Sequence, residues 1–391
     1  MVENWEDILN VAPSPGMACQ PGEFRVAAAG LDHNHITGMA QGLIEAGASL
    51  DLVFDPDPTK VQAFRAKFPS VKPANSLDEI LESKEIQLVA CAAIPSERSQ
   101  VAAQVLKAGK DFFVDKPPLT TLSQLSSVRE IVENSERKFL VYFSERLHNE
   151  SATAAAILIE RGAIGRVLQV LGLGPHRLNA ANRPEWFFQR ARYGGILCDI
   201  GSHQIEQFLF FSGSRDATIL SAAVANYHHP DTPELEDFGE ASLVGNDGSS
   251  HYFRVDWFTP DGLSSWGDGR TIILGTDGYI ELRKNVDIGH GRGDQVYLVN
   301  SKGEFHFSVA GKLGYPFFGH LIRDCLERTE RAMSQEHIFK AAELGLKAQE
   351  QAVRLWPVTG MPTSPTSPGT RRFPRTAVAT PQMQCDIHRH L

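Results

Sequence analysis

Short apolar runs alternate with amphipathic segments over the first third of the chain, from Phe24 onward. The runs have the length and the continuous apolar character of strands buried in a parallel sheet. The intervening segments carry apolar residues at helical spacing, as Ile36, Met39 and Leu43 do. Because strands that alternate with helices form parallel sheets covered on both faces, we expect a doubly wound, Rossmann-type α/β domain over residues 22–147. The expected strands are 24–30, 50–54, 86–93, 111–115 and 138–144.

The pattern changes after residue 148. One predicted helix, 151–162, is followed by longer strands separated by turns such as Asn-Asp-Gly, Thr-Asp-Gly and Ser-Lys-Gly. Those turns are typical of antiparallel hairpins. Two amphipathic segments, 316–331 and 335–355, predict closing helices. We therefore expect a C-terminal α+β domain over residues 148–356, built on an open, mostly antiparallel sheet.

The two ends of the chain lack such periodicity. Residues 1–21 contain Pro and Gly and are interpreted as an N-terminal arm. Residues 357–391 are rich in Pro, Ser, Thr and Arg without an apolar period, which predicts a disordered tail.

Composition narrows the function classes. The 391 residues are 42% hydrophobic and carry a net charge of −9, which argues against binding to a nucleic-acid backbone. No run of 18 apolar residues predicts a membrane span, and the acidic N-terminus does not have the form of a secretory leader. The cysteines are widely spaced, as free thiols of a reducing compartment are, so we expect a cytoplasmic protein. They are Cys19, Cys91, Cys198, Cys325 and Cys385.

The loop after the first predicted strand lies where a dinucleotide diphosphate binds. It reads Gly30-Leu31-Asp32-His33-Asn34-His35, and it keeps only the first glycine of the G-x-G-x-x-G fingerprint. Asp32, in place of the second glycine, adds bulk and negative charge beside the expected diphosphate, so cofactor use needs a direct test. Asp55 ends the second strand, where a carboxylate would bind the adenosine ribose and favour NAD over NADP. Its alternative role is to cap the turn before Pro56.

The same loop permits a second interpretation. Asp32, His33 and His35 are ligand types for a divalent metal, although they equally suit a helix cap with polar loop histidines. Since no second cluster at metal spacing is present, we predict no resident metal and keep the metal site as an alternative.

Two further segments resemble the Gfo/Idh/MocA family of oxidoreductases (glucose–fructose oxidoreductase and inositol dehydrogenase). The first holds Ala93-Ile94-Pro95, Ala108-Gly109-Lys110 and Asp115-Lys116-Pro117, similar to the family's nicotinamide loop, helix end and Glu-Lys-Pro strand end. The second, 191–213, is similar to its Gly-Gly-x-Leu-x-Asp-x-Gly-x-His segment. Supporting similarities are Ser144-Glu145-Arg146, the Arg-Pro-x-Trp at 183–186, and 275–282.

The resemblance covers residues 24–355 and implies a nicotinamide-dependent sugar or polyol oxidoreductase. It implies that the cofactor is bound by Ala93, Pro95, Asp115, Lys116 and Arg146, in addition to residues 30–35 and Asp55. Asp115 departs from the family's Glu. The substrate site is expected to contain Lys116, His176, Trp186, Asp199 and His203.

Elementary chemistry supports three of these residues as catalytic. Oxidation of a secondary alcohol requires a hydride acceptor and a group that takes the hydroxyl proton. Lys116 follows a buried strand, and an apolar wall there would favour its neutral amine; a surface lysine is the alternative. Asp199 and His203 are four residues apart, so on one helix the carboxylate would orient the imidazole; a capping Asp with a solvated His is the alternative. Trp186 would stack on a sugar or fill the domain interface.

We therefore predict an NAD(P)-dependent dehydrogenase that acts on CH–OH groups of a small sugar or polyol, with NAD as the favoured cofactor. One alternative is a lyase or hydratase of the same fold with tightly bound cofactor or metal. Another is a non-enzymatic nucleotide or sugar sensor, against which the joint presence of Lys116, Asp199 and His203 argues. The open sheet would present an apolar face, so a homo-oligomer, dimer or tetramer, is expected.

Overall fold

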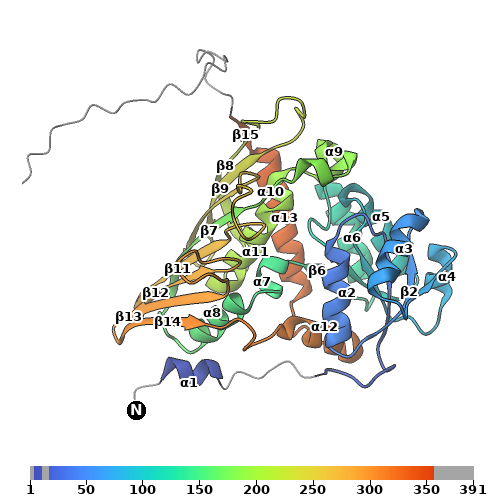
Figure 1. Cartoon of the computed structure of the whole chain (residues 1–391), viewed down its shortest axis with the longest axis horizontal. Helices are drawn as coiled ribbons and strands as arrows, with labels where there is room; N and C mark the ends of the chain where they lie inside the picture. Colours follow the sequence, from blue (N-terminus) through green and yellow to red (C-terminus); the bar gives the residue numbers. More distant parts are fainter. Residues whose placement is uncertain (1–3, 11–16, 356–391) are drawn as a thin grey trace, which may run out of the picture. The chain divides into compact units, whose positions relative to one another are not determined.

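The computed structural model describes residues 4–10 and 17–355, and its first domain is a parallel six-stranded sheet with the order β3-β2-β1-β4-β5-β6 (Figure 1). This is the doubly wound sheet that the alternating pattern predicts. Its strands are β1 (Arg25–Ala29), β2 (Ser49–Phe54), β3 (Lys72–Pro73), β4 (Leu88–Cys91), β5 (Asp111–Asp115) and β6 (Phe139–Tyr142). Its helices are α2 (His35–Glu45), α3 (Pro58–Lys67), α4 (Leu77–Glu82), α5 (Arg98–Lys107, after the 3-10 turn η1, Pro95–Glu97), α6 (Leu122–Glu133) and α7 (Ser144–Leu147).

The second domain is a nine-stranded mixed sheet with the order β14-β13-β12-β11-β7-β10-β9-β8-β15. Most of its pairs are antiparallel, while β7 pairs with β10, and β8 with β15, in parallel. The strands are β7 (Val167–Pro175), β8 (Ala217–Ala225), β9 (Phe238–Gly245), β10 (Ser250–Asp256), β11 (Arg270–Gly275), β12 (Gly278–Arg283), β13 (Gln295–Asn300), β14 (Gly303–Ser308) and β15 (Val353–Arg354). The helical elements are α8 (Glu150–Glu160), η2 (Ala180–Asn182), η3 (Glu185–Phe188), α9 (Arg190–Tyr193), α10 (Ile196–Asp199), α11 (Gly201–Ser212), α12 (Pro316–Glu327) and α13 (Gln335–Gln351).

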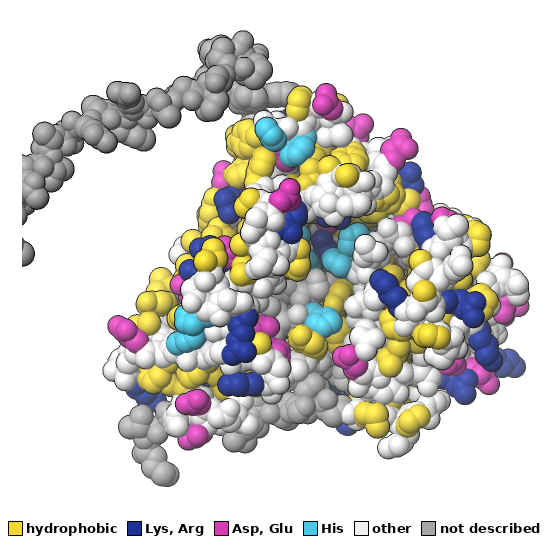
Figure 2. Space-filling model, in the orientation of Figure 1, with side chains coloured by type: hydrophobic (Ala, Val, Ile, Leu, Met, Phe, Trp, Pro, Cys, Tyr) yellow, Lys and Arg dark blue, Asp and Glu magenta, His cyan; other side chains and the backbone are white. Residues whose placement is uncertain are grey.

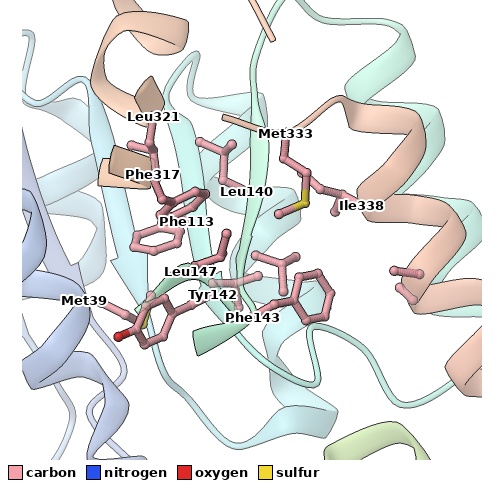
Figure 3. Packing of buried hydrophobic residues seen from close by; sticks show 14 of the residues in the cluster. Met39, Phe113, Leu140, Tyr142, Phe143, Leu147, Phe317, Leu321, Met333 and Ile338 are labelled. Atoms are coloured by element: carbon pink, nitrogen blue, oxygen red, sulfur yellow. The ribbon is translucent and has the colours of Figure 1, made fainter. Parts of the chain in front are cut away.

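Helices join the two sheets. α11 packs on β7 and β10, and α13 contacts α11 and β8 on one side and α6 and β6 on the other, so α13 lies between the domains (Figure 1). α12 packs on α2, where a Cβ on Gly42 would meet the ring of Phe318 at 2.2 Å. Figure 3 shows Phe317 and Leu321 of α12 packed beside Phe113 and Tyr142 of the parallel sheet. The last helices therefore tie the C-terminal domain to the first sheet.

The outer face of the nine-stranded sheet is partly apolar. Along β11, Ile272 and Leu274 are exposed while Ile273 is buried, which is the alternation expected of a sheet with one covered face. Tyr279 is exposed on the neighbouring strand β12, and Leu220 is exposed on β8, farther across the sheet. Homo-oligomerisation through such a face stays a prediction.

The N-terminal arm contains one element that the sequence pattern did not reveal. Residues 5–10 form a six-residue helix, α1, whose Trp5 and Leu9 are buried. The Lys302 Nζ lies 4.5 Å from the centroid of the Trp5 ring. One and a half helical turns are too short to show a periodicity, which is why the pattern missed it.

The predicted tail, 357–391, lies outside the described residues, as do Cys385 and positions 1–3 and 11–16. The other four cysteines are buried and form no disulfide. Within residues 4–10 and 17–355, no helix is long and apolar enough to cross a membrane.

Candidate active site

A cleft of about 760 Å³ lies at the carboxyl ends of β1, β4 and β5, beneath the segment that follows β7. This is the edge at which open parallel sheets bind ligands. Figure 2 shows histidine and basic side chains gathered along the hollow. Its lining residues are Leu31, Asp32, His33, Asn34, His35, Lys60, Pro95, Arg98, Lys116, Pro117, Ser144, His176, Arg177, Ala181, Asn182, Arg183, Pro184, Trp186, Phe187, Tyr193, Asp199, His203, Trp257 and Trp266.

The single fingerprint glycine is structurally required. Gly30 has a φ of +71°, and a Cβ there would meet the Ala93 Cβ at 2.7 Å. Ala93 is thus buried under the loop, not exposed in the cleft. Asn34, the N-cap of α2, makes no capping side-chain hydrogen bond, but the His33 Nδ1 accepts from the His35 N–H at 3.3 Å, so His33 partly caps this helix start beside the cleft.

Lys60 compensates the negative charge of Asp32. Its Nζ lies 2.6 Å from Asp32 Oδ1 and 3.7 Å from Asp55 Oδ1. Burial by itself would lower the pKa of Lys60, but the hydrogen bond and charge of Asp32, together with the charges of Asp55 and Asp57, raise that pKa. Lys60 therefore reduces the repulsion that Asp32 would exert on a diphosphate. The sequence pattern did not identify this lysine.

Asp55 is committed to the backbone. Its carboxylate accepts hydrogen bonds from the N–H groups of Leu31 (2.6 Å) and Asp57 (2.9 Å), and its side chain is 2% exposed. It does not line the cleft. Asp55 thus caps the turn at Asp57 and holds the loop at residues 30–35 through the Leu31 N–H.

Asp115 is the centre of a buried polar cluster. Its side chain is fully buried and accepts from the Arg98 Nη2 (3.1 Å) and the Lys116 backbone N–H (2.8 Å), and it contacts both loop histidines. Burial would raise the pKa of Asp115, but the neighbouring His35 and Arg98 hold it well below its usual range. Asp115 therefore positions the loop and Lys116.

The two loop histidines lie beside Asp115, which takes the place of Asp32 in the alternative metal site. The Nδ1 atoms of His33 and His35 lie 3.1 and 2.8 Å from the Asp115 carboxylate, and ligand atoms of all three residues lie within 4.8 Å of one another. Such a trio could hold a divalent metal. Asp32, which the sequence placed in this cluster, is paired with Lys60 instead.

Lys116 and Asp199 form a buried ion pair across the two domains. The Lys116 Nζ donates to Asp199 Oδ1 at 2.7 Å, and the two side chains are 4% and 12% exposed. Burial would raise the pKa of Asp199, yet the charge and hydrogen bond of Lys116 lower it. The sequence led us to expect an apolar wall beside Lys116, whereas the structure places a carboxylate there.

His203 has a different acidic neighbour from the one expected. Asp199 ends α10 and His203 lies in the first turn of α11, so the two do not share one continuous helix. Burial lowers the pKa of His203 to about 3, and the charge that opposes this most is that of Glu145. Among the described residues, the buried His203 Nδ1 has no hydrogen-bond partner.

Glu145 belongs to a second buried cluster behind the cleft. Its Oε2 accepts from Gln204 Nε2 (2.7 Å) and from Lys284 Nζ (3.3 Å). Its Oε1 lies 3.8 Å from His176 Nε2, beyond hydrogen-bond length, and finds no partner within the part of the chain that the structure describes. Burial would raise the pKa of Glu145, but Lys284 and the histidines lower it to about 2. Glu145 is therefore an anion whose free oxygen faces the imidazoles.

Of the remaining expected site residues, three line the cleft and one does not. Pro95, His176 and Trp186 line the cleft as expected. Arg146 does not; its Nε donates to both Glu206 oxygens (2.8 and 2.9 Å), and its guanidinium lies 3.7 Å from the Phe210 ring.

Sequence reasoning did not assign a role to seven other polar and aromatic residues, because most of them act through a neighbour that is distant in the chain. Glu145 stands inside the matched Ser-Glu-Arg segment, so its position was found but its role was given to Arg146. The signal for Arg98, which is 1% exposed, is its place on the buried face of α5, four residues before Ala102 and seven before Val105. The missed residues are Lys60, Arg98, Glu145, Arg183, Trp257, Trp266 and Lys284.

Comparison with known proteins agrees with this geometry. A model of the oxidoreductase family with an NAD-binding Rossmann fold matches residues 25–143, which defines the class of the first domain. A model of the GFO/IDH/MocA C-terminal domain matches residues 153–281. The chain belongs to the Gfo/Idh/MocA family of oxidoreductases.

Individual relatives are similar over different lengths. A crystal structure from Erwinia carotovora atroseptica, of a protein named only provisionally as an oxidoreductase, is 54% identical, with a TM-score of 0.84 over 85% of this chain and 100% of that one. Levoglucosan dehydrogenase in complex with NADH has the same fold (TM-score 0.71, 17% identity, 84% and 96% of the two chains). An uncharacterized oxidoreductase of Schizosaccharomyces pombe is 30% identical over 223 residues, 55% of this chain and 57% of that protein. The chain spans about half the length of the curated relatives it matches.

Proposed function

We propose that this protein transfers a hydride between NAD and a secondary hydroxyl of a sugar, polyol or derivative. The observation that carries the proposal is the meeting, in one cleft, of the loop at residues 31–35 with the Lys116–Asp199 pair and His203. A nucleotide loop and a proton-handling centre at one sheet edge are the arrangement that alcohol oxidation requires.

The residues of the first domain fit a dinucleotide. The start of α2 lines the cleft, so the positive end of the helix dipole lies beside the expected diphosphate, and Lys60 offsets the charge of Asp32 there. Residues 31–35 would hold the diphosphate, and Pro95 and Lys116 would flank the nicotinamide. We propose NAD over NADP because two carboxylates, Asp32 and Asp55, surround the single Lys60 cation, which would disfavour a further phosphate.

The bound oxidised nicotinamide would accept the hydride, that is, the two electrons and the hydrogen of the substrate C–H bond. The Lys116 ammonium, held by Asp199, donates a hydrogen bond to the substrate oxygen and orients it. His203, which burial keeps neutral at working pH, accepts the hydroxyl proton as the C–O bond becomes C=O. Glu145, with an unpartnered oxygen on the side of the imidazoles, stabilises the imidazolium that forms.

A second candidate function rests on the trio of His33, His35 and Asp115. A metal bound there would favour a lyase or hydratase reaction in which Lys116 and His203 abstract a proton. Metal analysis of the purified protein separates the two: stoichiometric zinc or manganese would favour the lyase, and metal-free protein with full activity would exclude this version of it.

The proposal is tested by incubating the full chain with NAD or NADP and a panel of sugars, polyols and their acids. Reduction of the nucleotide, followed by absorbance and confirmed by identification of a ketone product, is the expected result. Calorimetric titration with each nucleotide serves as a reading that is independent of turnover. Failure to bind either nucleotide would contradict the proposal.

A further inference from the structure

The charges that line the cleft do not balance. Five cationic side chains face it, against the two carboxylates of Asp32 and Asp199. We propose that the substrate carries a carboxylate and that Arg183 binds it, so that the enzyme acts on a polyhydroxy acid and not on a neutral sugar. This inference rests on the proposed function and names its substrate class.

Arg183 differs from the other four cations in its partners. Its Nε donates to the Leu178 carbonyl (2.9 Å) and its Nη2 to the Arg177 carbonyl at 3.5 Å. Within residues 4–10 and 17–355 it contacts no carboxylate. Each of the other cleft cations has one: Lys60 with Asp32, Arg98 with Asp115, Lys116 with Asp199, and Arg177 with Asp261.

Aromatic rings hold the Arg183 guanidinium in place. It lies 4.4 Å from the centroid of the Phe187 ring and 5.1 Å from that of Trp257, and both rings line the cleft. Stacking of this kind fixes the plane of a guanidinium while its edge stays available for a planar, bidentate acceptor. Its Nη1 makes no hydrogen bond within the described chain. A carboxylate matches this geometry.

The surroundings also place this cation near the reacting centre. Burial lowers the pKa of Arg183, and the charge that opposes the shift is that of Asp199, the partner of Lys116. A partly desolvated cation without a counter-charge costs free energy, which an incoming anion would recover. A carboxylate at Arg183 would therefore leave a neighbouring hydroxyl-bearing carbon near Lys116 and His203.

The rest of the wall suits the carbon skeleton of such a substrate. Trp186, Trp257 and Trp266 line the same cleft and give it apolar ring surface against which the C–H groups of a sugar chain or ring can pack. In the reaction the carboxylate is unchanged. One C–H bond and one O–H bond of a secondary alcohol break, the hydride goes to NAD, and the proton leaves through His203.

The test compares acids with their matching alcohols on the full chain, in the presence of NADH, so that binding is read without turnover. Gluconate with glucitol, galactonate with galactitol, and shorter aldonates with their alditols form the pairs; glucitol 6-phosphate supplies a different anion. At least one acid is expected to bind ten-fold or more tightly than its alcohol, as a charge-assisted pair provides. The kcat/KM values of these acids and alcohols, measured with NAD, should rank in the same order as their affinities.

Two variants assign the preference to the residue. Arg183→Gln is expected to bring the acid-to-alcohol ratio close to one, without changing the affinity for NADH, while Arg183→Lys should keep part of it. Arg192→Gln, which removes a surface partner of Glu97 outside the cleft, should leave the ratio unchanged. Equal binding of every acid and alcohol, a preference that survives in Arg183→Gln, or a preference for the phosphate would overturn the inference. If NADH binds and neutral polyols are oxidised as well as acids, the inference fails while the proposed function stands.

Discussion

The two sides of the cleft treat their charges differently. On the cofactor side, each acid and base is paired within the first domain: Lys60 with Asp32, and Arg98 with Asp115. On the substrate side, Glu145 Oε1 and His203 Nδ1 are buried without hydrogen bonds among the described residues, and Arg183 has no carboxylate partner there. The cofactor side therefore holds its polar groups in place before any ligand binds. On the substrate side, a substrate anion would pair with Arg183, and Glu145 would meet His203 once that imidazole is protonated. The following changes would break or sharpen this contrast.

The largest effect is expected at the contact between the two sides. Lys116→Met should lower kcat/KM by about a thousand-fold, within the range typical of loss of a hydrogen-bond donor to the reacting oxygen. Binding of NAD, measured by calorimetry, should change little, because the diphosphate loop is held by Asp55 and Asp115. A variant that loses NAD affinity to the same degree as activity would show that Lys116 acts in cofactor binding instead.

The next effect concerns the cluster behind His203. Glu145→Gln leaves the buried Lys284 ammonium without its counter-charge, and should lower the free energy of unfolding by about 3 kcal/mol. The double variant Glu145→Gln/Lys284→Met removes both charges and should recover most of that loss in denaturant titrations. If the double variant regains stability but not kcat, the Glu145 carboxylate serves catalysis as well as folding. Full activity in both variants would argue against a role for Glu145 beside His203.

The buried histidines predict a dependence of stability on pH. Burial lowers the pKa of His203 to about 3 and of His176 to about 4, below the value of about 6.5 in an unfolded chain. The unfolded state therefore binds more protons below pH 6.5, and stability should fall as the pH drops from 6.5 toward 4. Each such histidine contributes about 1.4 kcal/mol per pH unit inside this window.

The variant His203→Gln isolates the contribution of His203 to this pH dependence. Its slope of unfolding free energy against pH should correspond to about one proton fewer taken up on unfolding. An unchanged slope between pH 4 and 6.5 would mean that His203 is not held neutral by burial.

The smallest effect is expected on the cofactor side. Lys60→Met leaves Asp32 uncompensated beside the diphosphate site and should weaken NAD binding by about ten-fold, as loss of one partly exposed counter-charge does. Lys67→Met, which removes only a bond to the Thr37 hydroxyl, is the matched control. Tighter binding of NAD in Lys60→Met would contradict the compensating role.

Local signals made most of the fold predictable. Apolar runs and helical spacing identify β1, β2, β4, β5 and β6, and the Asn-Asp-Gly turn separates β9 from β10 as expected. The parallel pairing of β7 with β10 was not predictable, because it joins residues about eighty positions apart and leaves no trace in the local pattern. The packing of α12 on α2 depends likewise on a distant contact, that of Phe318 with Gly42.

The site was predictable where one segment carries the signal. Lys116, Asp199 and His203 all line the cleft as expected. Their partners were assigned incorrectly, since Asp199 meets Lys116 and not His203, and only the folded chain brings Glu145 and Lys284 together. Asp55 had two plausible roles, and choosing between them required the position of the Leu31 N–H group.

The most direct test of the contrast is a crystal structure of the full chain grown with NAD. We expect the dinucleotide along residues 30–35 with its nicotinamide beside Lys116, and the ion pairs Lys60–Asp32 and Arg98–Asp115 unchanged. A cleft that stays empty at saturating NAD, or a dinucleotide that binds only by breaking those pairs, would contradict this expectation.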